Sequence, residues 1–219
     1  MADGPDRQEL LTALTTEHFT LQGSRSQTVS ESAARASLYV FSVSSTLVAL
    51  GFIGQISEVG DVFDVFALTV LPTLYLLGLF TFVRLVESSV EDILYGRAIN
   101  RIRSYYLQRA GDEARWFMLS GHDDPLGVLT NMGIKPSRRQ LFFGIGTMIA
   151  LINSVVGGSA VAIAAGAIAD PPLGVAVAIG GVAAIISFVA MSRADQRMHD
   201  LGGMADEPMF PSPPLGESR

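Results

Sequence analysis

Four long apolar runs constrain what this chain can fold into more than any other feature of its sequence. They cover residues 38–56, 62–83, 141–168 and 173–191. A helix needs about 20 residues to cross a hydrocarbon core of about 30 Å, and each run is about that long or longer. Helices buried in a soluble protein are the alternative, which four such runs in 219 residues disfavour. The runs predict an all-α integral membrane protein with four transmembrane helices.

The composition agrees with this fold class. Charged residues make up 16% of the chain and hydrophobic residues 49%, whereas soluble domains carry about 25% charge. The absence of cysteine excludes disulfides and thiolate-ligated metals. A net charge of -6 gives no electrostatic basis for binding nucleic acid. Because the start of the chain is polar and the first apolar run begins only at Leu38, we expect that run to remain as an anchor and not to be a cleaved signal.

The placement of basic residues predicts the orientation. Segments 57–61 and 169–172, which join the first run to the second and the third to the fourth, contain no Lys or Arg. Most of the basic residues instead follow the second and fourth runs: Arg84, Arg97, Arg101, Arg103, Arg109, Arg115, Lys135, Arg138, Arg139, Arg193 and Arg197. Cytoplasmic loops carry such an excess. We therefore expect two transmembrane hairpins in the lipid bilayer, with the N and C termini in the cytoplasm.

This topology divides the chain into five segments. They are a cytoplasmic N-terminal helical segment (1–37), a first transmembrane hairpin (38–84), a cytoplasmic helical region (85–140), a second transmembrane hairpin (141–192) and a cytoplasmic, largely disordered tail (193–219). Its residues 202–219 are expected to be disordered because they are rich in Pro and Gly.

The second hairpin is rich in small residues, which let helix backbones approach closely. The candidate packing positions are Ser154, Gly157, Gly158, Gly180 and Gly181. Asn153 is the most polar residue deep in a run, so it needs a hydrogen-bond partner and either joins helices or lines a conduit. No ionisable residue lies at the centre of any run, which disfavours a proton-coupled or ion-coupled carrier.

Two positions in and after the second run are candidate hinges. Pro72 cannot donate to the carbonyl of Leu68, which predicts a kink that serves as a hinge or is a static bend. The amphipathic helical pattern continues beyond residue 84, and its apolar stripe changes face at Gly96, a weak helix former. We expect this helix to extend into the cytoplasm and to bend or change partners there.

The cytoplasmic segments carry the remaining candidate site. Arg97, Arg101 and Arg103 make a basic face that either binds an anionic ligand or lipid headgroup or is merely solvated. The apolar face of the N-terminal segment is expected to pack on the same helix.

Thr28 and Glu31 have the spacing of a capping box, which predicts a second helix start there. Residues 121–125 (GHDDP) are expected to form a turn and not a metal cluster.

No catalytic site is predicted. The sequence contains no phosphate-binding loop, dinucleotide fingerprint, nucleophile elbow or helical His-Glu metal motif. With three His, no Cys and no carboxylate pair inside an apolar run, we expect no enzyme, no cofactor and no metal.

Residues 37–56, 82–87 (FVRLVE) and 97–107 (RAINRIRSYYL) resemble uncharacterised four-helix integral membrane proteins of actinobacteria. The resemblance implies the cytoplasmic membrane of a bacterium. The order of cytoplasmic helix, hairpin and cytoplasmic helix is also similar to that of SLATT-type membrane effectors, which implies a role in permeabilising the membrane. Neither resemblance carries a functional residue.

Three functions remain as hypotheses. The first is a non-enzymatic interaction or signalling module whose cytoplasmic helices bind another copy, as a homo-oligomer, or a partner membrane protein. The second is an oligomeric pore or membrane-permeabilising effector, which the glycine-rich hairpin and Pro72 suggest. The third is a small carrier, for which Asn153 is nearly the only internal polar candidate.

Overall fold

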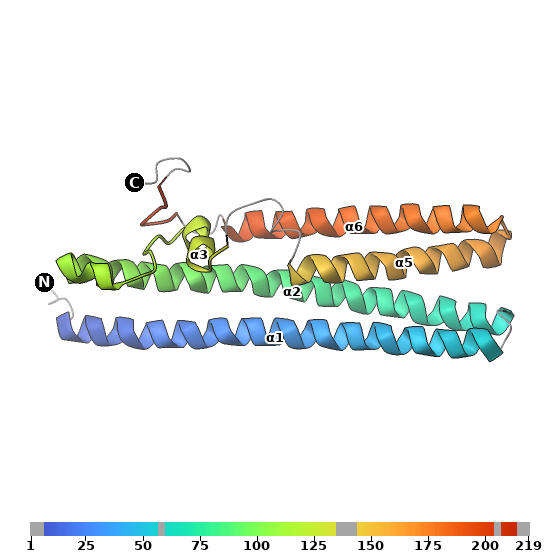
Figure 1. The fold of residues 1–219 in the computed structure, drawn as a ribbon, viewed down its shortest axis with the longest axis horizontal. Helices are drawn as coiled ribbons and strands as arrows, with labels where there is room; N and C mark the ends of the chain where they lie inside the picture. Colours follow the sequence, from blue (N-terminus) through green and yellow to red (C-terminus); the bar gives the residue numbers. More distant parts are fainter. Residues whose placement is uncertain (1–6, 57–59, 135–143, 204–206, 214–219) are drawn as a thin grey trace, which may run out of the picture. The chain divides into compact units, whose positions relative to one another are not determined.

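The fold of the described residues is entirely helical. A computed structural model describes residues 7–56, 60–134, 144–203 and 207–213, and no strand occurs in these ranges. The helices are α1 (Arg7–Ile56), α2 (Asp61–Ala110), η1 (Gly111–Trp116), α3 (Pro125–Asn131), α5 (Ile145–Ala169) and α6 (Leu173–Gly203) (Figure 1). Four of them, α1, α2, α5 and α6, are long and apolar enough to cross a membrane. The predicted helical class and the four candidate spans are confirmed; residues 141–143 of the third run lie outside the described ranges.

Helix α1 begins at Arg7 and runs without interruption to Ile56. The capping box predicted at Thr28 and Glu31 is therefore wrong, because no helix starts there. The Thr28 hydroxyl donates instead to the carbonyl of Arg25 at 2.8 Å, inside the helix. A hydroxyl that bonds back to the preceding turn is compatible with a continuing helix, so the spacing alone could not mark a boundary.

Helix α2 continues past residue 84 to Ala110, as the amphipathic pattern predicted. It is assigned as one helix through both candidate hinges, Pro72 and Gly96. At Gly96 the lack of a side chain admits α3, since a Cβ there would lie 2.6 Å from Cγ1 of Val128. The structure thus gives Gly96 a packing role, and its use as a hinge stays a prediction.

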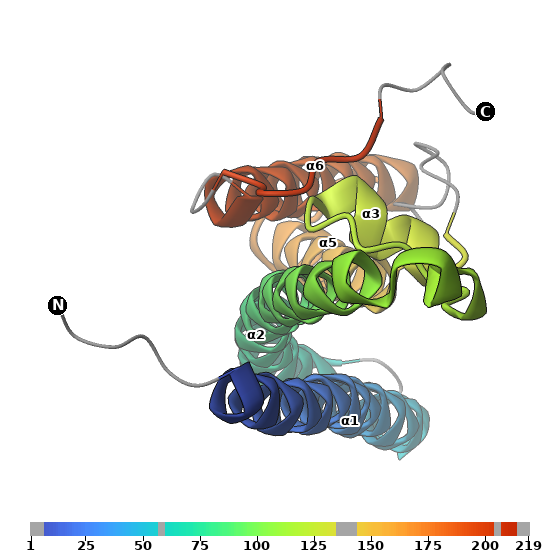
Figure 2. The same cartoon turned by 90° about the vertical axis from the view of Figure 1, so that its left-hand side faces the viewer.

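The chain divides into two compact units. Unit 2 comprises Ser32–Glu87 and Leu141–Asp200. Within it α2 lies between α1 and α5, and α5 lies between α2 and α6 (Figures 1 and 2). Its core takes residues from all four helices: Ala36, Tyr39, Val43, Ala67, Leu71, Leu74, Phe82, Leu85, Val86, Ile149, Ala150, Val156, Ala160 and Met191. Outside this core, large apolar side chains are exposed.

Unit 1 comprises Met1–Glu31, Ser88–Gln140 and Leu201–Arg219. In it the first part of α1 packs on the last part of α2, as predicted. The ring of His18 meets that of Tyr106 edge-on with centroids 6.2 Å apart, and the Thr15 and Tyr106 hydroxyls are 3.3 Å apart. The loop after η1, the short helix α3 and the tail segment 207–213 complete the unit.

The sequence predicted a largely disordered tail, but the described residues of the tail form a helix end and a hydrogen-bonded segment. Helix α6 continues to Gly203, and residues 207–213 are held by hydrogen bonds to the loop before α3. The reason is that carboxylates 86 or more positions earlier in the chain accept the tail's backbone N–H groups, which a compositional argument about the tail cannot detect. Residues 204–206 and 214–219 lie outside the described ranges.

Candidate functional site

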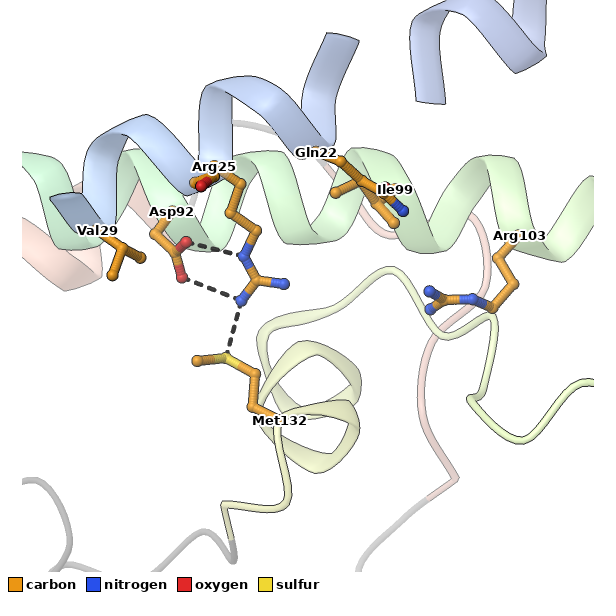
Figure 3. A pocket seen from close by; sticks show the side chains of 8 residues that line it. Gln22, Arg25, Val29, Asp92, Ile99, Arg103 and Met132 are labelled. Carbon is orange, nitrogen blue, oxygen red and sulfur yellow. Dashed lines mark hydrogen bonds and ion pairs between the residues drawn. The ribbon is translucent and has the colours of Figure 1, made fainter. Parts of the chain in front are cut away.

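An ion pair joins α1 to α2 at the edge of an open pocket in unit 1. The Arg25 guanidinium donates to both carboxylate oxygens of Asp92, from Nε at 2.8 Å and from Nη2 at 3.1 Å. Nη2 also lies 2.9 Å from the sulfur of Met132, which follows α3 (Figure 3). Such a two-point pair between partly buried groups fixes the orientation of the arginine as well as its charge.

The pocket beside this ion pair has a volume of about 450 Å³. Its lining combines polar and apolar side chains from α1, α2 and the turn after α3: Gln22, Arg25, Ser26, Val29, Asp92, Ile99, Arg103 and Met132. The guanidinium of Arg103 points toward the space that Arg25 faces from the other side (Figure 3). A molecule with one anionic group and a short apolar part would match this lining.

The electrostatics of the pocket favour an anion. Burial, and then the charge of Arg25, lower the pKa of Arg103 below its ordinary value. Burial, and then the charge of Arg103, lower the pKa of His18 in the same way. Burial, the larger cause, disfavours the charged form of each group. The smaller cause is repulsion between neighbouring cations, which an anion would relieve.

The loop before α3 has a buried carboxylate at its centre. Asp123 is 0% exposed, and its Oδ2 accepts from Nε of Arg101 at 2.7 Å. Its main-chain carbonyl accepts from Nε of Arg97 at 2.8 Å. Arg97 and Arg101 of the predicted basic face therefore hold this loop. Arg103 lines the pocket, and its Nη1 also donates to the carbonyl of Ser120 at 3.3 Å.

Burial acts to raise the pKa of Asp123, because it disfavours the charged form. The hydrogen bonds that the carboxylate accepts, from Phe210 first and then from Arg101, act in the opposite direction and outweigh burial. The pKa of Asp123 therefore lies below its ordinary value, and the group is a fixed negative charge at neutral pH.

The rest of the loop is anchored by further side chains. Nδ2 of Asn100 donates to the carbonyl of His122 at 2.7 Å, and the Ser104 hydroxyl donates to that of Gly121 at 2.6 Å. Asp124 is the N-cap of α3, where its Oδ1 accepts from the N–H of Gly127 at 2.9 Å. The predicted turn at residues 121–125 is thus a helix-capping loop. Across the four described ranges, no three His, Cys, Asp or Glu side chains are grouped as a metal site requires.

Unit 2 contains a second polar cluster, around Asn153. This residue is 0% exposed, and its Oδ1 accepts from the hydroxyl of Tyr39 at 2.8 Å. Its Nδ2 lies 3.9 Å from the sulfur of Met191. Tyr39 of α1 can reach Asn153 of α5 because α2 has a glycine at this point. A Cβ at Gly78 would lie 2.1 Å from Oδ1 of Asn153. A buried amide with these partners supports the packing hypothesis over the conduit hypothesis.

Hydroxyl groups join α2, α5 and α6 beside this cluster. Ser154 donates to the carbonyl of Ala150 at 2.7 Å and lies 3.2 Å from the hydroxyl of Ser187. The Tyr75 and Ser187 hydroxyls are 2.9 Å apart. Three side chains from α2, α5 and α6 thus share one polar contact, which gives each hydroxyl a partner inside an apolar unit.

The predicted small residues differ in what they contact. A Cβ at Gly158 would lie 2.5 Å from the carbonyl oxygen of Gly180, and a Cβ at Gly180 would lie 2.5 Å from that of Gly158. A Cβ at Gly157 would lie 2.6 Å from the ring of Tyr75. A Cβ at Gly181 meets no atom of another helix within 4 Å in the described part of the chain. The structure therefore brings Gly158 and Gly180 together and leaves Gly181 at the surface.

Sequence reasoning missed Tyr39 and Gly78 in unit 2, and Arg25, Asp92 and Asp123 in unit 1. Their contacts join residues 114 positions apart in one case and 67 in another. Local periodicity carries no signal over such separations. Asp123 had been assigned only to a turn, since its neighbours Gly121 and Pro125 are typical of turns.

No protein-family model, curated protein or solved structure matches this chain.

Proposed function

We propose that this is a non-enzymatic integral membrane protein of the bacterial cytoplasmic membrane that acts as an interaction or signalling module through unit 1. Its two pairs of apolar helices would form two transmembrane hairpins, with both termini in the cytoplasm. The arginine distribution supports this orientation. The module would work as a homo-oligomer or with a partner membrane protein, and it would use no cofactor.

The observation that carries this proposal is the contrast between the two units. Large apolar side chains are exposed along all four helices of unit 2, among them Leu38, Phe41, Phe52, Val65, Phe80, Leu151, Val155, Val177 and Ile186. Phe41, for example, is 71% exposed. Soluble proteins rarely expose such surfaces, but lipid solvates them. Unit 1 also exposes large apolar side chains, among them Phe19, Trp116 and Met118, but it differs in having a polar network and an open pocket that suit recognition.

Cysteine labelling tests the insertion and its orientation. The chain has no Cys of its own, so an introduced Cys is the only one that can react. In intact cells, Asp61→Cys and Pro172→Cys are expected to react with a membrane-impermeant maleimide. Asp112→Cys is expected to react only after the membrane is permeabilised. The reverse pattern would invert the orientation, and recovery of the protein in the soluble fraction would refute insertion.

The predicted anionic-ligand site is proposed here in a revised form, at the pocket of Arg25 and Arg103. Inorganic phosphate, at constant ionic strength, is expected to stabilise unit 1 in nanodiscs made of zwitterionic lipid. Arg103→Gln is expected to weaken this effect about tenfold, or about 1.4 kcal/mol. Arg109→Gln, an exposed arginine on the same helix, is the matched control and should leave it unchanged.

Two outcomes of this titration would count against the pocket. Equal losses in the two variants would mean that the effect is general screening of charge. Stabilisation by anionic-lipid nanodiscs alone, with no response to phosphate, would assign the site to a lipid headgroup and not to a soluble anion.

An oligomeric pore is the alternative. The buried contacts of Asn153 do not support a conduit within one copy, so a pore would have to form between copies. The mass of the protein in native-lipid nanodiscs separates the two: a ring of several copies would support the pore, and a monomer or dimer would support the interaction module.

A further inference from the structure

The tail segment 207–213 lies on the loop before α3 through a regular set of hydrogen bonds. The N–H groups of Met209 and Phe210 donate to Oδ2 and Oδ1 of Asp123 at 3.1 and 2.7 Å. The N–H of Asp123 donates back to the carbonyl of Phe210 at 3.1 Å. The next carboxylate, Asp124, accepts from the N–H of Ser212 at 3.1 Å and from its hydroxyl at 2.7 Å.

The positions of the prolines match this set of acceptors. Pro208, Pro211 and Pro213 have no N–H, so Met209, Phe210 and Ser212 carry every N–H group of residues 208–213. All three donate to one of the two loop carboxylates. Prolines also favour an extended backbone, which lowers the entropy lost on docking. The spacing of N–H groups in this proline-spaced segment therefore matches the acceptors of the loop.

Recognition depends on the main chain more than on the side chains of the tail. Met209 is 65% exposed although its N–H is bonded to Asp123. The exception is the Ser212 hydroxyl, which donates to Asp124. Main-chain hydrogen bonds provide affinity in many peptide-binding proteins, with a few side chains adding specificity.

The loop is fixed by residues outside the tail. Arg101 and Arg97 hold Asp123 from α2, and Asn100 holds the carbonyl of His122. Asp124 is oriented by its cap on α3. A loop that is braced by two helices keeps its two carboxylates in place whether or not a peptide is bound, which is the property of a preformed site.

From these contacts we propose that the loop at residues 120–124 is a binding site for extended, proline-spaced peptide segments, which the chain's own residues 208–212 fill in cis. A segment with the same spacing of N–H groups, from another protein, competes with the tail for Asp123 and Asp124. Because a tethered segment has an effective concentration on the order of millimolar, a free peptide binds well only when the tail is displaced.

The test uses the full chain in nanodiscs and a fluorescent peptide with the sequence Glu-Pro-Met-Phe-Pro-Ser-Pro. Met209→Pro removes the N–H that Asp123 accepts, whereas Met209→Ala removes the same exposed side chain and keeps that N–H. By fluorescence anisotropy, Met209→Pro is expected to bind the peptide at least about tenfold more tightly than the wild type. Met209→Ala is expected to bind it as the wild type does. The same peptide with phosphoserine in place of its serine should not bind, because a dianion would face Asp124.

Hydrogen exchange of residues 207–213 in the same samples shows whether the tail has left the loop. Faster exchange in Met209→Pro without peptide binding would overturn the proposal, since the vacated loop would then not be a site. Unchanged exchange in Met209→Pro would also overturn it, because the N–H contacts would then not hold the tail.

Discussion

The Gly180→Leu variant is expected to lose the packing of α5 on α6, whereas Gly181→Leu is expected to unfold at the wild-type temperature. A Cβ at Gly180 would lie 2.5 Å from the carbonyl oxygen of Gly158 and 2.7 Å from Cβ of Ala162. Neither atom can rotate away, because one belongs to the backbone and the other is fixed to it. The helices must separate, which costs contacts along the whole interface.

We expect a loss of about 3 kcal/mol for Gly180→Leu in purified protein in lipid nanodiscs. Gly181→Leu is a matched control, since it adds the same side chain at the next position, where the Cβ meets no other helix within the described residues. Thermal unfolding followed by circular dichroism compares the two. Equal melting temperatures would contradict the contact between Gly158 and Gly180.

The second large effect is expected at Asp123. Asp123→Asn keeps the shape of the side chain but removes the charge that pairs with Arg101. It also presents an amide donor where three donors converge, from Arg101, Met209 and Phe210. Each buried donor left without its acceptor costs about 1–3 kcal/mol, whereas the side chain of Arg101 is 36% exposed and can turn to water.

Hydrogen exchange in the wild type and variant measures this loss locally. Residues 120–131 and 207–213 are expected to lose protection together in Asp123→Asn. Asp112→Asn changes the same residue type at an exposed position of unit 1 and is the control. Loss of protection in the tail alone would mean that the loop does not depend on the carboxylate.

The pH dependence of the wild type gives a second check on Asp123. Its pKa is lower in the folded protein than in the unfolded chain, so its stabilising contribution is fully present above the ordinary carboxyl value of about 3.9. The contribution is lost as the pH falls through the lower, folded-state pKa. Protection of residues 207–213 should therefore fall below about pH 4 in the wild type, and Asp123→Asn should remove that part of the pH dependence.

The four candidate spans and the helical class could be predicted because they depend on composition and local periodicity. A continuous apolar run of about 20 residues has few folded alternatives to a helix. The extension of α2 to Ala110 was predictable for the same reason, from the amphipathic pattern after residue 84. The apparent capping box at Thr28 failed because its spacing also occurs within a continuous helix.

The candidate sites were predicted only in part. Asn153 and Gly158 were identified because polar and small residues stand out in an apolar run, but the sequence could not distinguish Gly180 from its neighbour Gly181. That distinction depends on which side of α6 faces α5. The basic face was found as a charge pattern, yet all three of its arginines donate to the loop before α3, and Arg103 alone of them also lines a pocket.

The sequence by itself determined the four candidate spans of this protein, because each follows from interactions between residues three or four positions apart and from the length of its apolar run. Only the tertiary structure decided which side chains meet. Tyr39 reaches Asn153 past Gly78 over 114 positions, and Asp123 holds the backbone of Phe210 over 87. Such pairs depend on the rotation and register of packed helices and loops. Sequences with the same apolar pattern can pack with different rotations and registers, so the pattern does not determine the pairs.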